Sequence, residues 1–518
     1  ANNSNNSAHS GLGSNSSWYN YVLEREHYTG WQSLMDSLER RGISVGLYLS
    51  PYLEEIPMHL RSGRRYLFGE ATAGDYFVKR RVGEVGSGST SAAAGHAKKS
   101  EAMADKFLSS RNVIHRGGGS VGGTVGGLVP YNHFKKGKCG MIDPTNPSAA
   151  SWFKRTIKEE LLDYASASFW LASAGTGPPM DAHYTSASND GLAFHNSYGE
   201  KWAELNREAI REAGRDGDSF FIVDSAFGGS AKHAGTTSLG GDHIANFHRD
   251  ANDGNGVLLS ILNGIVNGGF SGLTHAHCAV SVAVPRQLKS SMTKGAMDSK
   301  SREMICRWFE MTAFTALFRT HDGGSCGAGG GMSCAYDDEY VLDQLARWSD
   351  VYVALAEYRL QLLNEASFQG YPVVRHPVLH FPNEERFNCC SISVGSKKQK
   401  KKSKDGYGNV SYGDDVPSFM LGDLIYVVPV VKSGVVKTKV YLPSGGWIHL
   451  WTEDQVAGPH NIGKTIEVMA PVGEPPVFVR DCDIMHRFME ELRQGGIIGT
   501  GSRVKAKSSS LFSSFRRK

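Results

Sequence analysis

The chain contains 518 residues, of which 40% are hydrophobic and 21% charged, so it can form a large globular domain with a smaller companion. A formal net charge of +4 is close to neutral for this length and gives no indication of a nucleic-acid partner. No apolar run reaches the roughly 18 residues of a membrane-spanning helix, so we expect no membrane span.

The eight cysteines are irregularly spaced and form no CxxC pair, so the sequence predicts neither a zinc site nor a disulfide framework. We expect no cofactor. Runs of Lys and Arg at 397–404 and 515–518 are typical of solvated, mobile charge. The chain starts at Ala1 without a signal peptide, which favours an internal piece of a longer polypeptide, with a processed mature form as the alternative.

The N-terminal part combines low-complexity segments with the first regular elements. Residues 1–17 are rich in Asn and Ser, and we expect them to be disordered. Residues 31–41 have the spacing of an amphipathic helix, and the apolar run at 42–51, bounded by Gly and Pro, predicts a buried parallel strand. The Gly- and Ser-rich stretch at 84–138 predicts a surface insertion.

From residue 141 onward, helical and extended patterns alternate at a spacing typical of a parallel α/β barrel. The chain offers about six strands of this kind, fewer than a closed (β/α)8 barrel has. Asn146 or Ser148 could cap the first helix. We expect helices at 149–165, 202–213, 256–267 and 302–315, and strands or strand ends around Ser173 and at 220–224, 239–243, 270–275 and 317–323.

Strand and turn patterns replace the helical ones after residue 372, as at 419–431 and 437–447. The pattern predicts a smaller β-domain after the barrel. The expected organisation is a barrel-type domain at 18–371, a C-terminal β-domain at 372–496 with a Lys-rich loop at 396–413, and a disordered basic tail at 497–518.

Residues 169–181 read Phe-Trp-Leu-Ala-Ser-Ala-Gly-Thr-Gly-Pro-Pro-Met-Asp. They resemble the fourth barrel strand and following loop of glycoside hydrolase family 31, and more narrowly of its sulfoquinovosidase and α-glucosidase-like branch, where the pattern is W-M-A-D-F-G-E-x-x-P-x-D. Segments at 66–81, 317–323, 419–431 and 437–447 also match family patterns. The resemblance implies a (β/α)8 barrel followed by a C-terminal β-sandwich, with the first two strands lying before Ala1.

The resemblance implies an α-glycosidase that hydrolyses O-glycosyl bonds with two carboxylates, one as nucleophile and one as acid/base. The family's nucleophile corresponds to Ser173, where a serine replaces the aspartate. The acid/base motif W-A-G-D-Q corresponds to Leu-Gly-Gly-Asp-His at 239–243, so Asp242 matches the acid/base position. Hydrolytic activity is therefore expected to be impaired.

The family motif H-S-D-I-G-G-Y corresponds to residues 275–281, where His277 replaces the Asp and Ser281 the Tyr. Two histidines two positions apart on a strand would point to the same side, as metal ligands can, but no third ligand is evident and polar packing is the favoured interpretation. The motif R-T-H-E-G is retained at Arg319 and His321, which in the family lie beside sugar hydroxyls. The implied substrate-binding residues for a carbohydrate or sugar-acid glycoside are Arg319, His321, His275, His277, Trp170 and Asp181.

Other residues could replace the missing nucleophile. Asp181 lies in the loop eight positions after Ser173, although its family counterpart is not the nucleophile, and Asp224 follows the fifth strand. Ser173 itself could act if a base such as His277 lay beside it. Strand ends of a parallel barrel meet at one rim. We therefore expect convergence at that rim of Ser173, Asp224, Asp242, His275 and His321.

The sequence is compatible with three functions. The first is a family 31-like scaffold that has lost hydrolytic competence and serves in sugar binding or as a structural element. The second is an active α-glycosidase with a rearranged carboxylate pair. The third is an assembly component whose Lys-rich loop and Gly-rich insertion contact partners.

Overall fold

The computed structural model describes fifteen stretches of the chain, and the segments at 1–17, 84–138 and 396–413, for which the sequence made predictions, lie outside them. The described residues are 20–23, 28–58, 61, 65–80, 139–163, 167–172, 178, 182–185, 191–238, 257–281, 283–285, 297, 299–321, 332–387 and 417–499. Within these ranges, no helix combines the length and the apolar character needed to cross a bilayer. The chain forms two compact units, residues 16–234 and residues 235–518 together with 1–15, each described here by itself.

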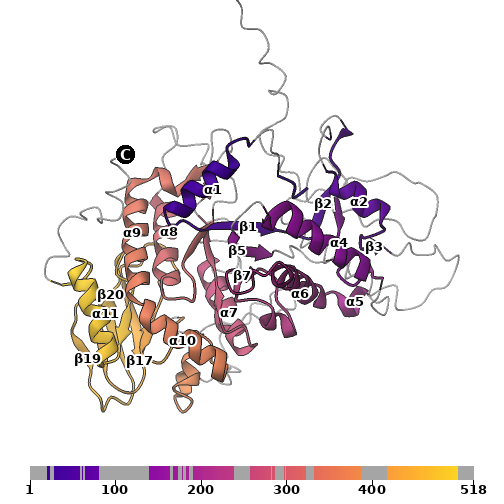
Figure 1. The fold of residues 1–518 in the computed structure, drawn as a ribbon. Coiled ribbons are helices and arrows are strands. Elements are labelled where there is room, and N and C mark those ends of the chain that lie inside the picture. Colours follow the sequence, from indigo (N-terminus) through magenta and orange to yellow (C-terminus); the bar gives the residue numbers. More distant parts are fainter. Residues whose placement is uncertain are drawn as a thin grey trace, which may run out of the picture. The chain divides into compact units, whose positions relative to one another are not determined.

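The unit at 16–234 contains a parallel sheet with the strand order β1 (Val45–Leu49), β5 (Ala167–Ala172) and β7 (Phe220–Val223). The register pairs Leu49 with Ala172 and Ala172 with Val223, so the three strands end together (Figure 1). The crossover helices before β5 and β7 are α4 (Pro147–Ile157) and α6 (Ser197–Glu212). This alternation is the predicted parallel α/β arrangement.

Shorter elements complete this unit. Helix α1 (Trp31–Arg40) precedes β1 and confirms the amphipathic helix predicted there. The remaining elements are the antiparallel pairs β2 (Tyr52–Glu54) with β4 (Cys139–Met141) and β3 (Lys79–Arg80) with β6 (Ala182–His183), the helices α2 (Leu67–Ala73) and α5 (Gly191–Phe194), and the 3-10 turn η3 (Gly228–Lys232).

Helix α4 begins where the sequence predicted a cap. The side chain of Asn146 accepts hydrogen bonds from the backbone N–H groups of Ser148 at 3.0 Å and Ala149 at 3.3 Å, so Asn146 rather than Ser148 is the capping residue. The α-helix ends at Ile157, earlier than expected, and continues as the π-helical turn η2 (Lys158–Leu162).

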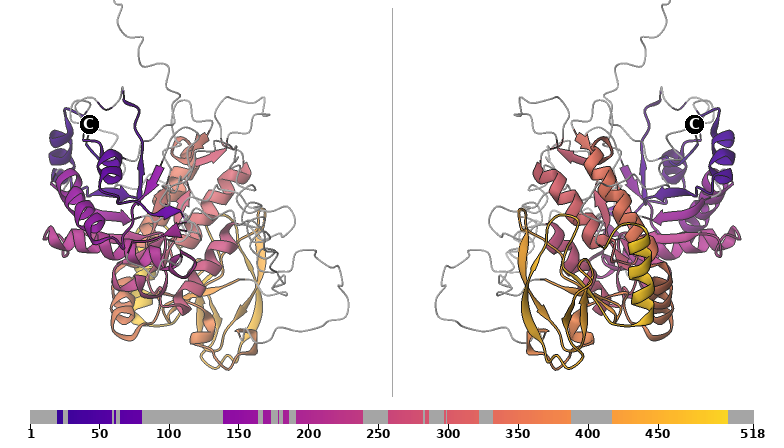
Figure 2. Two further views of the ribbon diagram at one scale, coloured as in Figure 1. Left: turned by 90° about the vertical axis from the view of Figure 1, so that its right-hand side faces the viewer. Right: turned by 90° about the vertical axis from the view of Figure 1, so that its left-hand side faces the viewer.

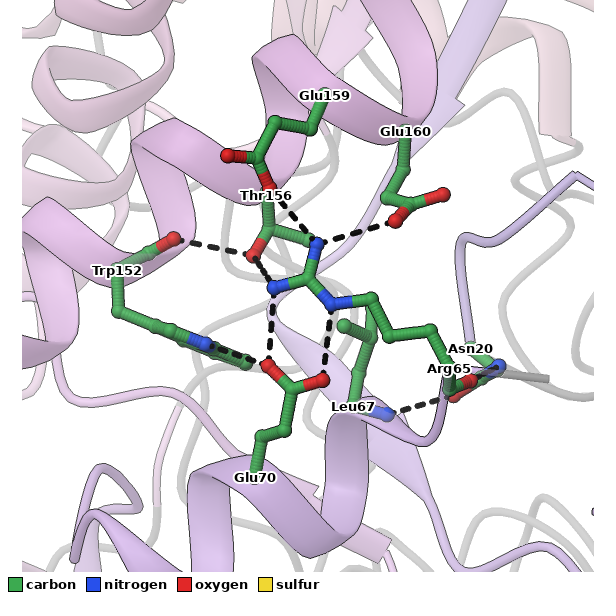
Figure 3. A network of polar contacts seen from close by, with 8 residues as sticks. All are labelled: Asn20, Arg65, Leu67, Glu70, Trp152, Thr156, Glu159 and Glu160. Carbon is green, nitrogen blue, oxygen red and sulfur yellow. Dashed lines mark hydrogen bonds and ion pairs between the residues drawn. The ribbon is translucent and has the colours of Figure 1, made fainter.

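The π turn supplies two carboxylates to a polar network around Arg65 (Figure 3). The Arg65 guanidinium donates to both carboxylate oxygens of Glu70, at 2.8 and 2.9 Å, and to Glu159 and Glu160 at 3.1 Å each. The indole N–H of Trp152 donates to Glu70 at 2.9 Å. The network ties the start of α2 to α4 and to the π turn.

The described residues of the unit that contains 235–518 include two parallel strand pairs. β8 (Thr236–Ser238) pairs with β9 (Ala276–His277), and β10 (Ala279–Ser281) pairs with β12 (Arg319–His321). Further elements are α7 (Val257–Phe270), α8 (Ser299–Thr312), η4 (Ala335–Asp337), α9 (Glu339–Ala354), α10 (Ala356–Gln369), and the antiparallel pair β11 (Ala283–Pro285) with β13 (Met332–Cys334).

The strand predicted at 270–275 is wrong. Helix α7 continues to Phe270, and the chain then turns before β9 starts at Ala276. The turn is closed by backbone hydrogen bonds from Ser271 to Asn267 and from Leu273 to Gly268, and Gly272 adopts a φ of 85° that favours glycine. The short apolar segment was therefore a helix end and not a strand.

The C-terminal part of this unit is built on antiparallel β-sheets, which confirms the strands predicted at 419–431 and 437–447. Helix α11 (Asp483–Gln494) packs on α9 (Figure 2). Its buried residues, such as Phe488, belong to the hydrophobic core of this unit. The six-stranded sheet has the order β14 (Val374–Arg375), β15 (Phe419–Leu421), β16 (Ile425–Val427), β21 (Val477–Val479), β18 (Trp447–His449) and β19 (Gln455–Ala457), and a second pair joins β17 (Lys437–Leu442) to β20 (Lys464–Met469). The 3-10 turns η5 (Pro377–Leu379) and η6 (Glu385–Phe387) precede β15.

A buried arginine joins helix α8 to this β-domain. Arg307 donates to the carboxylate of Glu310 at 2.9 Å and to the carbonyl oxygens of Val435 and Ala470, each at 2.8 Å. The second oxygen of Glu310 accepts from the N–H of Gly473 at 2.7 Å. Because both charged side chains are 1% exposed, removing either one would leave the other charge buried without its partner.

The contacts of Arg65 with Glu70 should make the stability of the protein depend on pH. The hydrogen bond from Arg65 holds the pKa of Glu70 below its ordinary value of 4.5. A carboxylate whose pKa is lowered on folding stabilises the protein above its unfolded pKa, and that contribution is lost as the pH falls through the folded pKa. Glu70→Gln should lower the free energy of unfolding by about 1 kcal/mol at pH 7; the effect is modest because the pair of Arg65 and Glu70 is partly exposed.

Urea unfolding midpoints measured from pH 7 down to about pH 3 check this prediction, because the wild type should lose more stability over that range than Glu70→Gln. The control is Glu39→Gln on the exposed face of α1, which should leave the midpoints unchanged. Equal midpoints for wild type and Glu70→Gln at pH 7 would contradict the role of the network.

Candidate functional site

The predicted site residues divide into those that the structure describes and those that it does not. Ser173, Asp181 and Asp242 lie outside the described residues. Trp170 belongs to β5, where its backbone pairs with Leu47 of β1 and Phe221 of β7. The other predicted site residues that the structure describes are His275, His277, Arg319 and His321, and all four belong to the unit that contains 235–518.

Two of the strands expected at the rim end at the same edge of the first sheet. Ala172 of β5 and Val223 of β7 are paired in parallel register at their last residues. Asp224 follows β7 directly, and Ser173 is the next residue in the sequence after β5. The backbone register therefore agrees with the expectation for these two strands.

In the second unit, β8 ends at Ser238, so the predicted strand end at 239–243 lies beyond the described part of that strand. Thr237 pairs with Ala276 and Ser238 with His277. The parallel register therefore places His277 beside the last residue of β8.

His275 does not close a strand, in contrast to the prediction. It lies in the turn before β9, and its Nδ1 is 3.0 Å from the carbonyl oxygen of Gly235. Since a carbonyl oxygen only accepts, Nδ1 of His275 carries a proton. Burial lowers the pKa of His275, and the hydrogen bond to Gly235 acts in the opposite direction. This histidine holds the start of β9 against the start of β8.

His277 is fully buried and makes contacts through both ring nitrogens. Its Nδ1 lies 3.2 Å from the hydroxyl oxygen of Thr236, and its Nε2 accepts from Nε of Arg319 at 3.4 Å. The pKa of His277 is lowered to about 3, mainly by burial and in addition by the charge of Arg319, against the opposing effect of a backbone hydrogen bond at Thr237. His277 is therefore neutral at physiological pH.

The register of β10 and β12 places the remaining predicted residues on one face. Ala279 pairs with Arg319 and Ser281 with His321, and alternate residues of a strand share a face. Arg319 and His321 are half-buried. Thr320 lies on the other face, where its hydroxyl is 2.7 Å from the hydroxyl of Tyr336. The structure therefore brings together Arg319, His321, Ser281 and His277.

The two neighbouring histidines contact different polar groups of the protein. Nδ1 of His275 contacts a backbone carbonyl, whereas the two ring nitrogens of His277 contact Thr236 and Arg319. Across the described ranges, no group of three or more His, Cys, Asp or Glu side chains is placed to hold a metal ion. The polar-packing interpretation of this motif is the one that fits these contacts.

Thr236 belongs to the site although the sequence reasoning did not single it out. Its hydroxyl donates to the carbonyl oxygen of His275 and lies against the ring of His277. The available signal was a Thr-Thr pair shortly before the acid/base motif, but the contact of Thr236 with a histidine about 40 positions away depends on the pairing of β8 with β9.

Two family models match most of the chain. The model for the glycosyl hydrolases family 31 TIM-barrel domain matches residues 12–328, and that for the glycosyl hydrolase family 31 C-terminal domain matches residues 370–485. Both matches agree with the fold class predicted from the sequence.

Curated relatives include two sulfoquinovosidases. That of Agrobacterium fabrum is 33% identical over 371 residues, which cover 71% of this chain and 48% of the relative. That of Escherichia coli is 27% identical over 354 residues, which cover 68% of this chain and 44% of the relative. The chain thus spans about half the length of these relatives.

Among solved structures, a family 31 sulfoquinovosidase from E. rectale, in complex with an aza-sugar inhibitor, matches with a TM-score of 0.66 at 24% identity, over 92% of this chain and 56% of that one. This match supports the fold. Taken with the family models and the curated relatives, it shows that the chain belongs to glycoside hydrolase family 31, in its sulfoquinovosidase and α-glucosidase-like branch, with the family's TIM-barrel domain followed by its C-terminal domain.

Proposed function

We propose that this chain binds a glycoside, and most favourably a sugar-acid glycoside, at the family 31 pocket but does not hydrolyse it. The observation that carries the proposal is Ser173, which stands where the matching family motif has the nucleophilic aspartate. Double displacement at a glycosidic centre requires a nucleophilic carboxylate and an acid/base about 5 Å apart. Asp242 matches only the second of these roles.

A serine nucleophile would need an adjacent base to take its proton. The sequence offered His277 for this role, but Nδ1 of His277 faces Thr236 and Nε2 accepts from Arg319. Its pKa of about 3, which results mainly from burial, also makes it a weak base near neutral pH. Both features argue against rescue by a Ser173–His277 pair.

The retained residues favour binding. Arg319 and His321 share one face at the end of β12, next to the buried His277 and Ser281. A guanidinium presents several N–H donors in a fixed plane, which suits sugar hydroxyls and the oxygens of an anionic substituent. A binding pocket needs only a few such convergent polar groups. The names of the two curated relatives support a sulfoquinovoside as the first ligand to test.

An active hydrolase with a rearranged carboxylate pair is the second candidate. It is favoured by one observation, the register that ends β5 and β7 at the same edge, because Asp224 follows β7 directly. In this alternative, Asp224 would take the role that the family assigns to the position of Ser173.

Hydrolytic assays separate the two candidates. On aryl α-sulfoquinovosides and aryl α-glucosides, the wild-type chain should show no turnover above buffer, whereas Ser173→Asp should restore a pre-steady-state burst and raise turnover by at least about a thousandfold. Ser173→Ala is the matched control and should stay inactive. Robust wild-type turnover that disappears in Asp224→Asn or Asp242→Asn would establish the rearranged pair instead.

Calorimetry tests the binding role. Methyl α-sulfoquinovoside should bind to the wild-type chain, and Arg319→Ala should weaken binding about 10- to 100-fold, as expected when a charged donor to a ligand is removed. The control is Arg487→Ala, which removes an exposed arginine that pairs with Glu357 and should leave affinity unchanged. Equal affinities for wild type and Arg319→Ala would refute the role of Arg319.

A further inference from the structure

We infer that His277 is a positioning residue: a one-directional hydrogen-bond chain that starts at Thr236 fixes its tautomer, and the ring then holds the guanidinium of Arg319. The inference rests on the proposed binding role of Arg319 and adds a specific residue to it. It follows from the donors and acceptors of three contacts, taken in order from β8 to β12.

The first contact fixes the hydroxyl of Thr236. This hydroxyl has one proton, and it donates that proton to the carbonyl oxygen of His275, which can only accept. Toward Nδ1 of His277, 3.2 Å away, the same oxygen can therefore only accept. It follows that Nδ1 of His277 is the protonated nitrogen.

The second step concerns the other ring nitrogen. A neutral imidazole protonated at Nδ1 presents a lone pair at Nε2. Nε2 of His277 faces Nε–H of Arg319 at 3.4 Å, so the lone pair accepts from the guanidinium. The chain thus runs in one direction, from Arg319 through His277 and Thr236 to the carbonyl of His275.

The other states of the ring do not fit these partners. With the proton on Nε2, a donor would face the donor of Arg319, and the bare Nδ1 would face an oxygen that has no proton to offer. A doubly protonated ring would also set a donor against Arg319 and would bury a second positive charge. His277 is 0% exposed, so water cannot relieve either mismatch.

Compared with the Asp of the family motif, His277 lacks a negative charge but keeps a hydrogen-bond acceptor. The family motif has Asp where this chain has His277. A carboxylate would accept from Arg319 and also bring a negative charge, whereas the neutral imidazole supplies the acceptor alone. His277 therefore orients Arg319 through a neutral acceptor and adds no negative charge of its own.

Nitrogen-15 NMR of histidine-labelled chain tests the tautomer without any ligand. The His277 signals, assigned by their loss in His277→Gln, should show a protonated Nδ1 and an unprotonated Nε2 near neutral pH. A protonated Nε2 would overturn the inference.

Two substitutions then separate positioning from simple packing. The amide oxygen of His277→Gln can reach the place of Nε2, whereas His277→Leu fills the space without an acceptor. The Nε–H of Arg319 should exchange with water more than about tenfold faster in His277→Leu than in wild type, and exchange in His277→Gln should be as slow as in wild type. Equal exchange in all three proteins would overturn the inference.

Affinity for methyl α-sulfoquinovoside should follow the same order: His277→Gln should bind within about threefold of wild type, and His277→Leu should bind at least about tenfold more weakly. Binding by His277→Leu as tight as that of wild type would contradict the positioning role. If no protein, including the wild type, binds the glycoside while the tautomer and exchange results hold, then the proposed binding function fails and the hydrogen-bond chain stands.

Discussion

The parallel pairing of β10 with β12 is the constraint on which the candidate site depends. It sets Ser281 opposite His321 and Ala279 opposite Arg319, so the retained family residues emerge on the face occupied by His277. A shift of one residue would move them to the opposite face, where Thr320 meets Tyr336. Backbone register therefore decides which side chains can act together, before any side-chain contact is considered.

Two arginines in the same unit show two ways of holding a guanidinium. Arg307 is fully buried and is matched by the carboxylate of Glu310 and by backbone carbonyls, an arrangement that fastens α8 to the β-domain. Arg319 is half-buried and receives a neutral acceptor from His277. The carboxylate of Glu310 neutralises the charge of Arg307, and the role of this pair is structural. The second arrangement fixes the direction of Arg319 while the contact at position 277 contributes no negative charge.

Patterns in the sequence predicted those helices, strands and caps that are determined by residues close together in the chain. The cap at Asn146, the helix at α1 and the strand at β17 follow from short-range chemistry and periodicity, and the structure confirms them. The strand expected at 270–275 failed because a short apolar run reads the same at a helix end. The contact between Thr236 and His277 could not be predicted, since it depends on which strands pair. The family motifs carried the identification of Arg319 and His321.

The most direct test of the central claim is a crystal structure of the wild-type chain soaked with an aryl α-sulfoquinovoside. The account predicts an intact glycosidic bond, with the sugar lying against Arg319 and His321 and no covalent link to the protein. A cleaved sugar, a glycosyl ester on Asp224, or a sugar bound away from Arg319 would contradict it.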